Sequence, residues 1–309
     1  MDLSAISPTL LIASLMVAAT PILLAALGEL VVEKAGVLNL GVEGMMIMGA
    51  ICGFIAGVET GSTWLGFGFA ALSGAVMALL FGFLTQVLLS NQVATGLALT
   101  LFGLGLSALL GQGYVGIKVD SLQRVDLGPL SDLPVVGRIL FGHDPMVYIS
   151  LLLLAATWAF LRFTRAGLIL RAVGESHDAA HALGYHVLRV RMMAIAFGGA
   201  CAGLGGAYLS LVRVPQWTDG MTAGAGWIAL AIVVFASWKP LRVLIGAYLF
   251  GGINVLQLNL QTAGAKVPVE LLSAAPYIVT ILVLVVISRR AGRGGDAPAD
   301  LGKPFHAST

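Results

Sequence analysis

RFTRAGLILRAVGESHDAAHALGYHVLRVR, residues 162–191, is the longest polar passage between apolar runs, and both of its ends continue into long hydrophobic segments. Its middle predicts one short helix. Ser176 is a good N-cap, Asp178 falls in the first turn, where the helix dipole favours negative charge, and Gly184 suits the left-handed position after a helix. Flanking arginines predict that this helix lies at the cytoplasmic membrane surface, suited to receiving force from a partner. An ordinary cytoplasmic loop is the alternative.

The composition assigns the chain to the integral membrane proteins. Of its 309 residues, 58% are hydrophobic and only 10% are charged, whereas soluble domains carry roughly 25% charged residues. The 40 glycines fit this class, especially in the string GGACAGLGGA (198–207), because small residues let membrane helices approach closely. Cys52 and Cys201 lie in apolar runs, so neither a disulfide nor a metal framework is indicated.

About nine hydrophobic segments follow one another along the chain. We expect them at residues 9–27, 45–58, 64–89, 93–112, 145–161, 192–212, 227–238, 243–260 and 269–287. A helix needs about 20 apolar residues to cross a bilayer, so the second and seventh segments are short enough to be partial. The expected fold is all-α: a polytopic integral membrane protein with about eight to ten transmembrane helices, some short or broken, in a single domain over residues 1–309.

The basic residues orient these segments. If residues 162–191 and the C-terminal tail are cytoplasmic and the segments alternate, the inside holds twelve Lys and Arg residues and the outside five, which accounts for all 17. This positive-inside bias supports the arrangement and puts the N-terminus outside. Residues 113–144 then form an external loop. The tail, residues 290–309, is basic at first and then small and polar, and we expect it to be disordered.

Polar residues within the apolar segments mark the expected solute pathway. They are costly inside a bilayer and therefore usually face a cavity or a partner. The candidates are Asn39, Glu43, Asn91, Gln92, Thr95, Asn254, Gln257 and Gln261. The last three share one helical face, and only Glu43 carries a charge, so we expect a neutral, hydrogen-bonding pathway. Hydrogen bonding between packed helices is the alternative for each residue.

The sequence contains no catalytic or nucleotide-binding motif of the common kinds. It has no G-x-x-x-x-G-K-[ST] loop, no G-x-S-x-G elbow and no H-E-x-x-H pair. His177 and His181 are four residues apart, but no carboxylate or cysteine completes a metal site. We therefore expect no enzyme activity, metal or cofactor in this chain. Two other classes stay open: a membrane-embedded enzyme, and an ion-driven transporter in which only Glu43 could serve as a relay.

Two segments carry a family resemblance. Residues 28–44, GELVVEKAGVLNLGVEG, contain G-x-x-N-L-G-x-E-G, and residues 171–184 contain R-A-x-G-E-S-x-x-A-A-x-x-x-G. Both resemble the permease subunits of ATP-binding-cassette (ABC) importers, in the branched-chain amino acid, ribose and nucleoside family. Residues 224–240 resemble its sugar and nucleoside branch. Ser176 departs from the asparagine usual in that family, but it preserves the cap.

The resemblance implies a function and its partners. The function is that of a transmembrane permease subunit for a small polar solute: a nucleoside first, with a simple sugar or branched-chain amino acid as alternatives. The partners are a cytoplasmic ATPase carrying ATP and Mg²⁺, a second permease subunit (the same or different), an extracytoplasmic binding protein and membrane lipid, but no nucleic acid polymer. The location is the plasma membrane of a prokaryote.

Within residues 162–191, the resemblance makes the short helix the element that couples to the ATPase. The coupling residues expected there are Gly174, Glu175, Ser176, Asp178, Ala179, Ala180 and Gly184. Ala179 and Ala180 are small enough to enter a groove on the partner closely.

Overall fold

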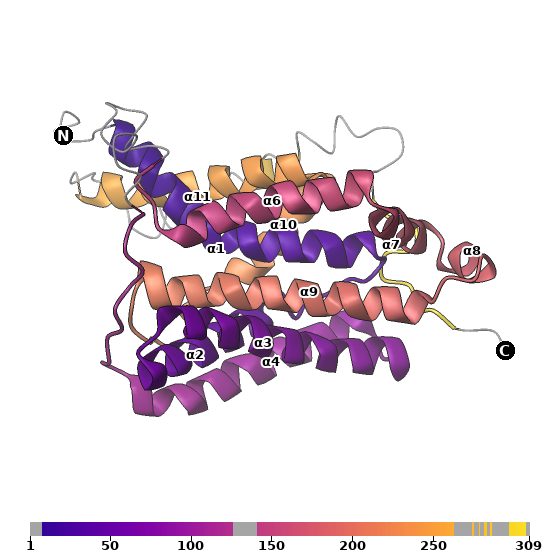
Figure 1. Ribbon diagram of the computed structural model, residues 1–309, viewed down its shortest axis with the longest axis horizontal. Helices are drawn as coiled ribbons and strands as arrows, with labels where there is room; N and C mark the ends of the chain where they lie inside the picture. The colour runs from indigo at the N-terminus through magenta and orange to yellow at the C-terminus, as the bar shows by residue number, and fades with distance from the viewer. Residues whose placement is uncertain are drawn as a thin grey trace.

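The computed structural model describes residues 8–125, 141–262 and 297–306, together with five single positions between 274 and 285. Its helices are α1 (Pro8–Lys34), α2 (Val42–Thr60), α3 (Thr63–Gly82), η2 (Phe83–Val87), α4 (Gln92–Gly111), η3 (Gln112–Tyr114), α6 (Pro145–Phe163), α7 (Arg165–Glu175), α8 (His177–Ala182), α9 (Val187–Tyr208), η5 (Leu209–Arg213), α10 (Ala225–Phe235) and α11 (Pro240–Thr262). Within the described residues, seven helical segments are long and apolar enough to span a membrane. The predicted all-α, polytopic fold is therefore confirmed (Figure 1). The ninth predicted segment lies almost wholly outside the described residues.

Capping residues fix where several helices begin. Ser62, Asn91 and Asp144 precede α3, α4 and α6, and each side chain accepts a hydrogen bond from a backbone N–H of the first turn. Pro145 occupies the first position of α6, where its missing N–H would have had no helical partner. Gly61 ends α2 with a φ of +66°, a left-handed conformation that permits the sharp turn into α3.

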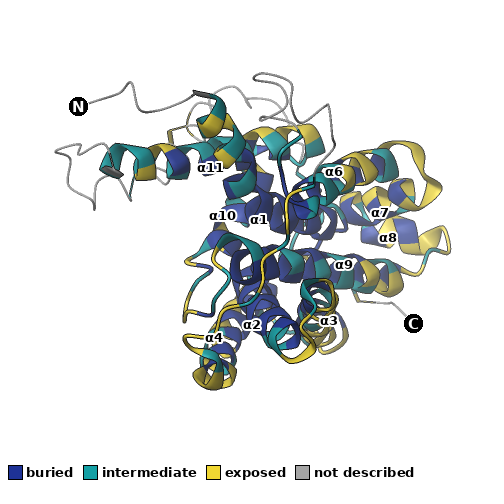
Figure 2. Ribbon diagram, turned by 60° about the vertical axis from the view of Figure 1, so that its left-hand side comes forward, coloured by how far each residue is buried: buried dark blue, intermediate teal, exposed yellow. Residues whose placement is uncertain are grey.

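Glycines bring α9 into direct backbone contact with its neighbours. The helices α1, α2 and α9 form the buried centre of the molecule (Figure 2), and α3 packs against α2 and α9. A Cβ atom added to Gly203 would lie 2.1 Å from the carbonyl oxygen of Ala70 in α3. One added to Gly206 would lie 1.8 Å from the carbonyl oxygen of Met46 in α2. The close packing predicted from the small-residue string is therefore present.

Loops that the basic residues assign to the same side of the membrane contact one another. On the predicted cytoplasmic side, the Leu38 N–H donates to the Gln92 side chain (2.8 Å). On the predicted outer side, the Val119 N–H donates to the Pro215 carbonyl (3.2 Å). Figure 1 has the start of α1 at one end of the bundle and α8 at the other. These contacts agree with the predicted alternation of the segments.

The connection between α1 and α2 contains irregular backbone at membrane depth. α1 continues to Lys34, past the predicted end at residue 27, and an irregular stretch follows. The Thr100 hydroxyl donates to the Leu40 carbonyl in this stretch (3.2 Å). Thr100 lies about 12 Å along α4 from the start of that helix, at 1.5 Å per residue. The irregular stretch is thus covered by α4, as non-helical backbone inside a membrane would need to be. The prediction of a partial second segment is wrong, because α2, with 19 residues, is long and apolar enough to span a membrane.

The C-terminal half gives one confirmation and one correction. α10 has 11 residues and is too short to cross a bilayer, as predicted for the seventh segment. The prediction of a disordered tail is wrong for residues 297–306, which pack against α7, α8 and the turn after α1. One of these bonds joins residues 123 positions apart, so a prediction from local composition could not include it. Residues 126–140 of the predicted external loop lie outside the described residues.

Candidate functional site

A cavity of about 340 Å³ lies among α1, η5, α10 and α11. Its polar lining residues are Arg213, Thr222, Asn254 and Gln257. Apolar side chains complete it: Pro21, Ile22, Leu209, Met221, Ala223, Ala225, Ile228, Phe250 and Leu258. The structure therefore brings two of the predicted pathway residues, Asn254 and Gln257, to one cavity, whereas Gln261 is not among its lining residues. Its size and mixed lining are those of a small-molecule site.

A larger cavity of about 780 Å³ adjoins the first on the predicted outer side. The two share Arg213 and Leu258. Polar residues of the outer cavity include Arg124, His143 and Asp144. The two cavities thus lie next to each other along α11 and share a partly polar wall. The neutral lining that we expected is wrong at Arg213, because the π-helix η5 continues α9 and carries this residue along the cavity wall.

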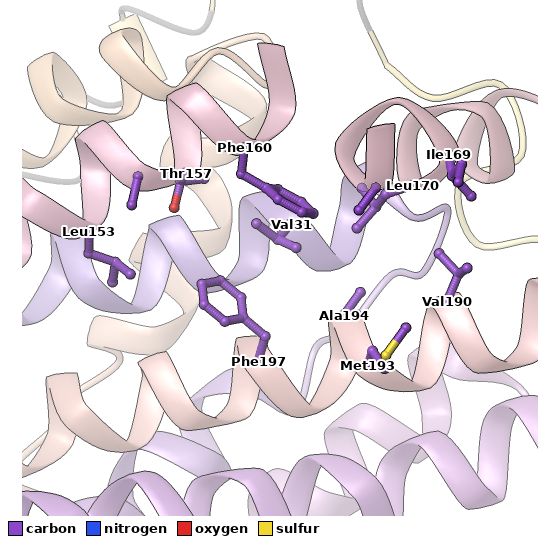
Figure 3. Close-up of a pocket in the computed structure, with 12 residues that line it drawn as sticks. Val31, Leu153, Thr157, Phe160, Ile169, Leu170, Val190, Met193, Ala194 and Phe197 are labelled. Atoms are coloured by element: carbon purple, nitrogen blue, oxygen red, sulfur yellow. The ribbon is translucent and has the colours of Figure 1, made fainter. Parts of the chain in front are cut away.

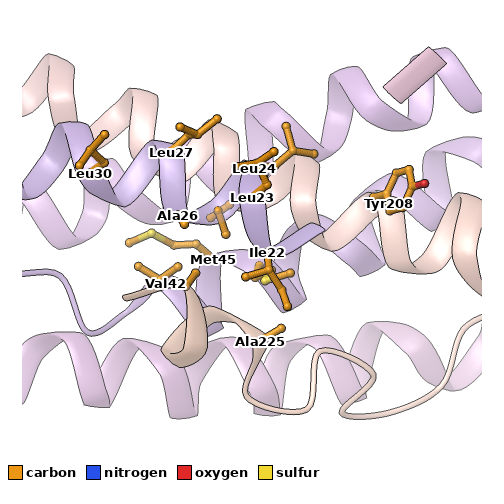
Figure 4. Close-up of a cluster of buried hydrophobic side chains, with 14 of the residues drawn as sticks. Ile22, Leu23, Leu24, Ala26, Leu27, Leu30, Val42, Met45, Tyr208 and Ala225 are labelled. Carbon is orange, nitrogen blue, oxygen red and sulfur yellow. The ribbon is translucent and has the colours of Figure 1, made fainter. Parts of the chain in front are cut away.

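Glu43 does not line either cavity, so its predicted place in the pathway is corrected. Its Oε1 accepts hydrogen bonds from the Thr222 hydroxyl (2.6 Å) and the Gly224 N–H (2.9 Å), and its Oε2 accepts one from the Gly226 N–H (2.7 Å). The carboxylate therefore caps the start of α10, where free N–H groups and the helix dipole favour a negative charge. Glu43 holds the loop that forms one cavity wall, and Figure 4 has its neighbour Val42 near Ala225 of α10.

Four other predicted pathway residues form hydrogen bonds within the protein instead. The Asn39 side chain accepts the backbone N–H two residues further on (2.9 Å), and Asn91 accepts the one three residues on as the N-cap of α4 (2.9 Å). Gln92 accepts the Leu38 N–H (2.8 Å), and Thr95 shares a hydrogen bond with the hydroxyl of a serine five residues before it (2.8 Å). None of the four lines the two cavities above. The structure thus favours the alternative of helix packing for these residues.

A third hollow, of about 580 Å³, opens between α6 and α9 and is shown in Figure 3. Its lining residues come from α1, α6, α7 and α9, and among them only Thr157 has a side-chain hydroxyl. Phe160 and Phe197 are two of the apolar groups. Because a polar solute would lose its hydrogen bonds to water here without replacement, this hollow is not the solute site.

Two buried carboxylates near the inner end of α1 were not among the predicted site residues. Glu29 accepts the Asn39 N–H (3.4 Å), and Glu33 accepts the indole N–H of Trp238. Both glutamates are at most 1% exposed. They hold the turn after α1 and the turn between α10 and α11. Their spacing of four residues is a helical signal, which the shorter predicted first segment missed.

The predicted coupling helix is present as α8, and its caps form as the sequence indicates. The Ser176 side chain accepts the Ala179 N–H (3.3 Å), and Gly184 has a φ of +87°. Asp178 lies exposed in the first turn. Together with α7, which ends at Glu175, α8 connects α6 to α9 on the predicted cytoplasmic side.

Two of the predicted coupling residues face inward. Ala180 is 2% exposed and packs with Val173 and Val187, so the prediction that it enters a partner's groove is wrong. Gly174 is also buried, and a Cβ atom there would lie 2.2 Å from the Lys34 carbonyl oxygen. The helical period turns Ala180 inward and leaves Ala179 outward. Leu183, which we did not predict, is the prominent outward group because its side chain is 76% exposed.

Comparison with known proteins now gives the family. The profile described as "Branched-chain amino acid transport system / permease component" matches residues 11–287. The chain belongs to this permease family. It is an ABC transporter permease subunit, not itself an enzyme, and a multi-pass protein of the prokaryotic plasma membrane. No solved structure gives a significant match.

Individual relatives extend over nearly the whole chain. The Haloferax volcanii protein named "Putative glucose ABC transporter permease protein TsgC13" is 43% identical over 289 residues, which cover 86% of this chain and 88% of the relative. The guanosine ABC transporter permease protein NupQ of Bacillus subtilis is 32% identical over 313 residues, 96% of each chain. The nucleoside ABC transporter permease protein NupC of Lactococcus lactis is 29% identical over 296 residues, with 91% and 93% covered.

Proposed function

We propose that this permease forms the translocation pathway for a neutral, hydroxyl-rich solute, a nucleoside or a simple sugar, and that the solute passes through the cavity lined by Asn254 and Gln257. That cavity is the observation that carries the proposal. Each side-chain amide both donates and accepts hydrogen bonds, which matches sugar hydroxyls and the polar edge of a base. Ile22 and Phe250 provide apolar contact for a ring face. The names of the relatives, which mention guanosine, nucleosides and glucose, support the same class.

A branched-chain amino acid fits this site less well. Its zwitterion needs an anion for the ammonium group as well as a cation for the carboxylate. Arg213 could supply the cation. The nearby carboxylate of Glu43, however, already accepts three hydrogen bonds from the loop before α10 and is 3% exposed. An ammonium group would therefore be left without a partner in a poorly hydrated cavity, which is unfavourable.

The proposal includes the partners of an importer. A separate ATPase subunit binds ATP and Mg²⁺ and docks on the exposed side of α8, where Ala179 and Leu183 face outward. An extracytoplasmic binding protein delivers the solute to the outer cavity. A second permease subunit, identical or different, completes the pathway.

The test is uptake into proteoliposomes by the complete transporter with both cavity amides changed, Asn254→Leu and Gln257→Leu. Each lost hydrogen bond should weaken solute binding by roughly fivefold to tenfold. Uptake of labelled nucleoside or sugar by the double variant should therefore fall by more than tenfold. Assembly and ATP hydrolysis should stay normal. Gln261→Leu is the matched control, because this residue lies on the same helix outside the cavity lining. Normal uptake by the double variant would show that the two amides only pack helices.

A further inference from the structure

Residues 297–306, here termed the C-terminal strap, cross the end of the molecule that holds α8 and contain a turn at residues 299–302. The Asp300 N–H donates to the Gly174 carbonyl at the end of α7 (3.0 Å). The Gly302 N–H donates to the Gly36 carbonyl in the turn after α1 (3.1 Å). In Figure 1 this yellow segment passes beside α7 and α9. The strap thus ties the approach to α8 to the turn that leads into α2.

The Asp300 side chain also holds the first residue of α8. Its Oδ2 accepts the His177 N–H (2.9 Å) and lies 2.7 Å from His177 Nδ1. Burial raises the pKa of the Asp300 carboxyl. Hydrogen bonds from the His177 N–H and from Lys303, and electrostatic attraction to these two residues, lower the pKa more, so it lies below its usual value. An ionised carboxylate at the start of α8 also suits the helix dipole.

Arg191 joins the strap to the membrane core. Its guanidinium is fully buried and donates to the Lys303 carbonyl (3.1 Å), the Gln86 side chain (3.2 Å) and the Ala35 carbonyl (3.2 Å). The same guanidinium approaches His177 Nδ1 at 3.4 Å. A buried cation is tolerated only when its N–H groups are satisfied, and the strap supplies one of these acceptors.

An apolar contact completes the docking. The ring of Phe305 lies edge-on to the rings of His177 and His181, with centroids 5.4 and 5.3 Å apart, on the side of the small core that contains Ala180. The strap therefore contacts α8 through the Asp300 carboxylate beside His177 and through an aromatic side chain, and it contacts the turn after α1 through the backbone.

We propose that the C-terminal strap is a positioning element for coupling: it fixes α8 to the turn after α1, so that movement of α8 is passed to the segment that carries Glu43. The contacts are contiguous. The strap bonds to Gly36, and the stretch after Gly36 leads to Glu43, whose carboxylate holds the cavity wall at Thr222 and Gly224. Asp300 is the positioning residue, because its carboxylate alone holds the first N–H of α8. This inference rests on the proposed coupling role of α8.

The test measures solute transported per ATP hydrolysed by the complex of permease, ATPase and binding protein in proteoliposomes. Asp300→Ala removes the acceptor for His177, while Asp300→Asn keeps one oxygen for the His177 N–H. Loss of a hydrogen bond to a charged group changes an equilibrium constant by roughly tenfold or more. Transport per ATP should therefore fall about tenfold in the alanine variant and less in the asparagine variant. His306→Gln is the control, because His306 is an exposed residue of the same strap.

The recovery of ATPase on purified permease separates the outcomes. Normal recovery with reduced transport per ATP is the expected result. Unchanged transport per ATP in Asp300→Ala would overturn the proposal, and so would loss of the ATPase, since the strap would then belong to the docking surface. If α8 does not dock the ATPase at all, the Leu183→Asp permease should still retain the ATPase on purification, and this result distinguishes failure of the proposed role of α8 from failure of the strap proposal.

Discussion

Replacing Glu43 with glutamine tests whether this residue holds the cavity wall instead of contacting the solute. The carboxylate accepts three hydrogen bonds, two at Oε1 and one at Oε2 from the Gly226 N–H (2.7 Å). In Glu43→Gln, one side-chain oxygen can keep the two bonds from Thr222 and Gly224. The amide nitrogen then faces the Gly226 N–H, so two donors oppose each other and the backbone N–H loses its acceptor.

The expected loss follows from these contacts. A hydrogen bond to a charged acceptor contributes about 1.5–3 kcal/mol, and a buried donor left without a partner costs about 1–3 kcal/mol. These two figures describe largely the same loss, so they are not added together. The lost attraction between the carboxylate and the start of α10 adds roughly 0.5–1 kcal/mol. We therefore expect Glu43→Gln to lower the free energy of unfolding by about 3 kcal/mol.

Thermal melting of the detergent-solubilised permease measures this effect, and uptake measures its consequence. The variant should melt at a lower temperature and transport less solute, but it should retain its ATPase, because α8 is remote from this contact. Glu59→Gln is the matched control: Glu59 is exposed at the end of α2 and accepts the Tyr114 hydroxyl (2.9 Å). A melting temperature for Glu43→Gln equal to that of Glu59→Gln would refute the reasoning.

Three further outcomes are expected. Gly203→Val should abolish the folded peak in size-exclusion chromatography, because even a Cβ atom would lie 2.1 Å from the Ala70 carbonyl oxygen. Gly105→Val is the control and should keep the folded peak, since no other atom lies within 4 Å of a Cβ atom placed there. Leu183→Asp should leave the permease folded but remove the ATPase on purification, because a charge would be buried without a partner; normal recovery would contradict this. The pKa of the Asp300 carboxyl is lowered in the folded protein, so the carboxylate stabilises strap docking fully above the unfolded pKa of about 3.9 and loses this effect only as the pH falls through the folded pKa. The protection of the Gly302 amide against hydrogen exchange should therefore stay constant from about pH 7 to about pH 5. Loss of this protection near about pH 6 would contradict the role of Asp300.

The features that could be predicted from the sequence depend on interactions between residues close together in the chain, or on properties summed over a segment. Hydropathy predicted the helical membrane fold, and the bias of basic residues gives a predicted orientation. The caps of α8 could be predicted because Ser176 and Gly184 act within a few residues of their own position. The close packing of α9 could be predicted because its small residues occur in one continuous string.

The features that could not be predicted depend on contacts between distant parts of the chain. Glu43 was taken for a pathway residue because its partners lie 179 to 183 positions away. Arg191 was counted only as a cytoplasmic charge, yet it is fully buried and bonds to a carbonyl 112 positions away. Ala180 and Ala179 are equally small in the sequence, and only the packing of α8 decides which of them faces outward.

Crosslinking from α8 to the ATPase tests the proposed coupling surface most directly. In a background with Cys52 and Cys201 replaced, a single cysteine at Leu183 that carries a photoreactive maleimide should crosslink to the ATPase subunit on illumination, because Leu183 is 76% exposed at the end of α8. A cysteine at Ala180, which is 2% exposed, should give little or none. If the cysteine at position 183 stays freely labelled in the assembled complex and forms no crosslink to the ATPase, α8 is not the coupling element.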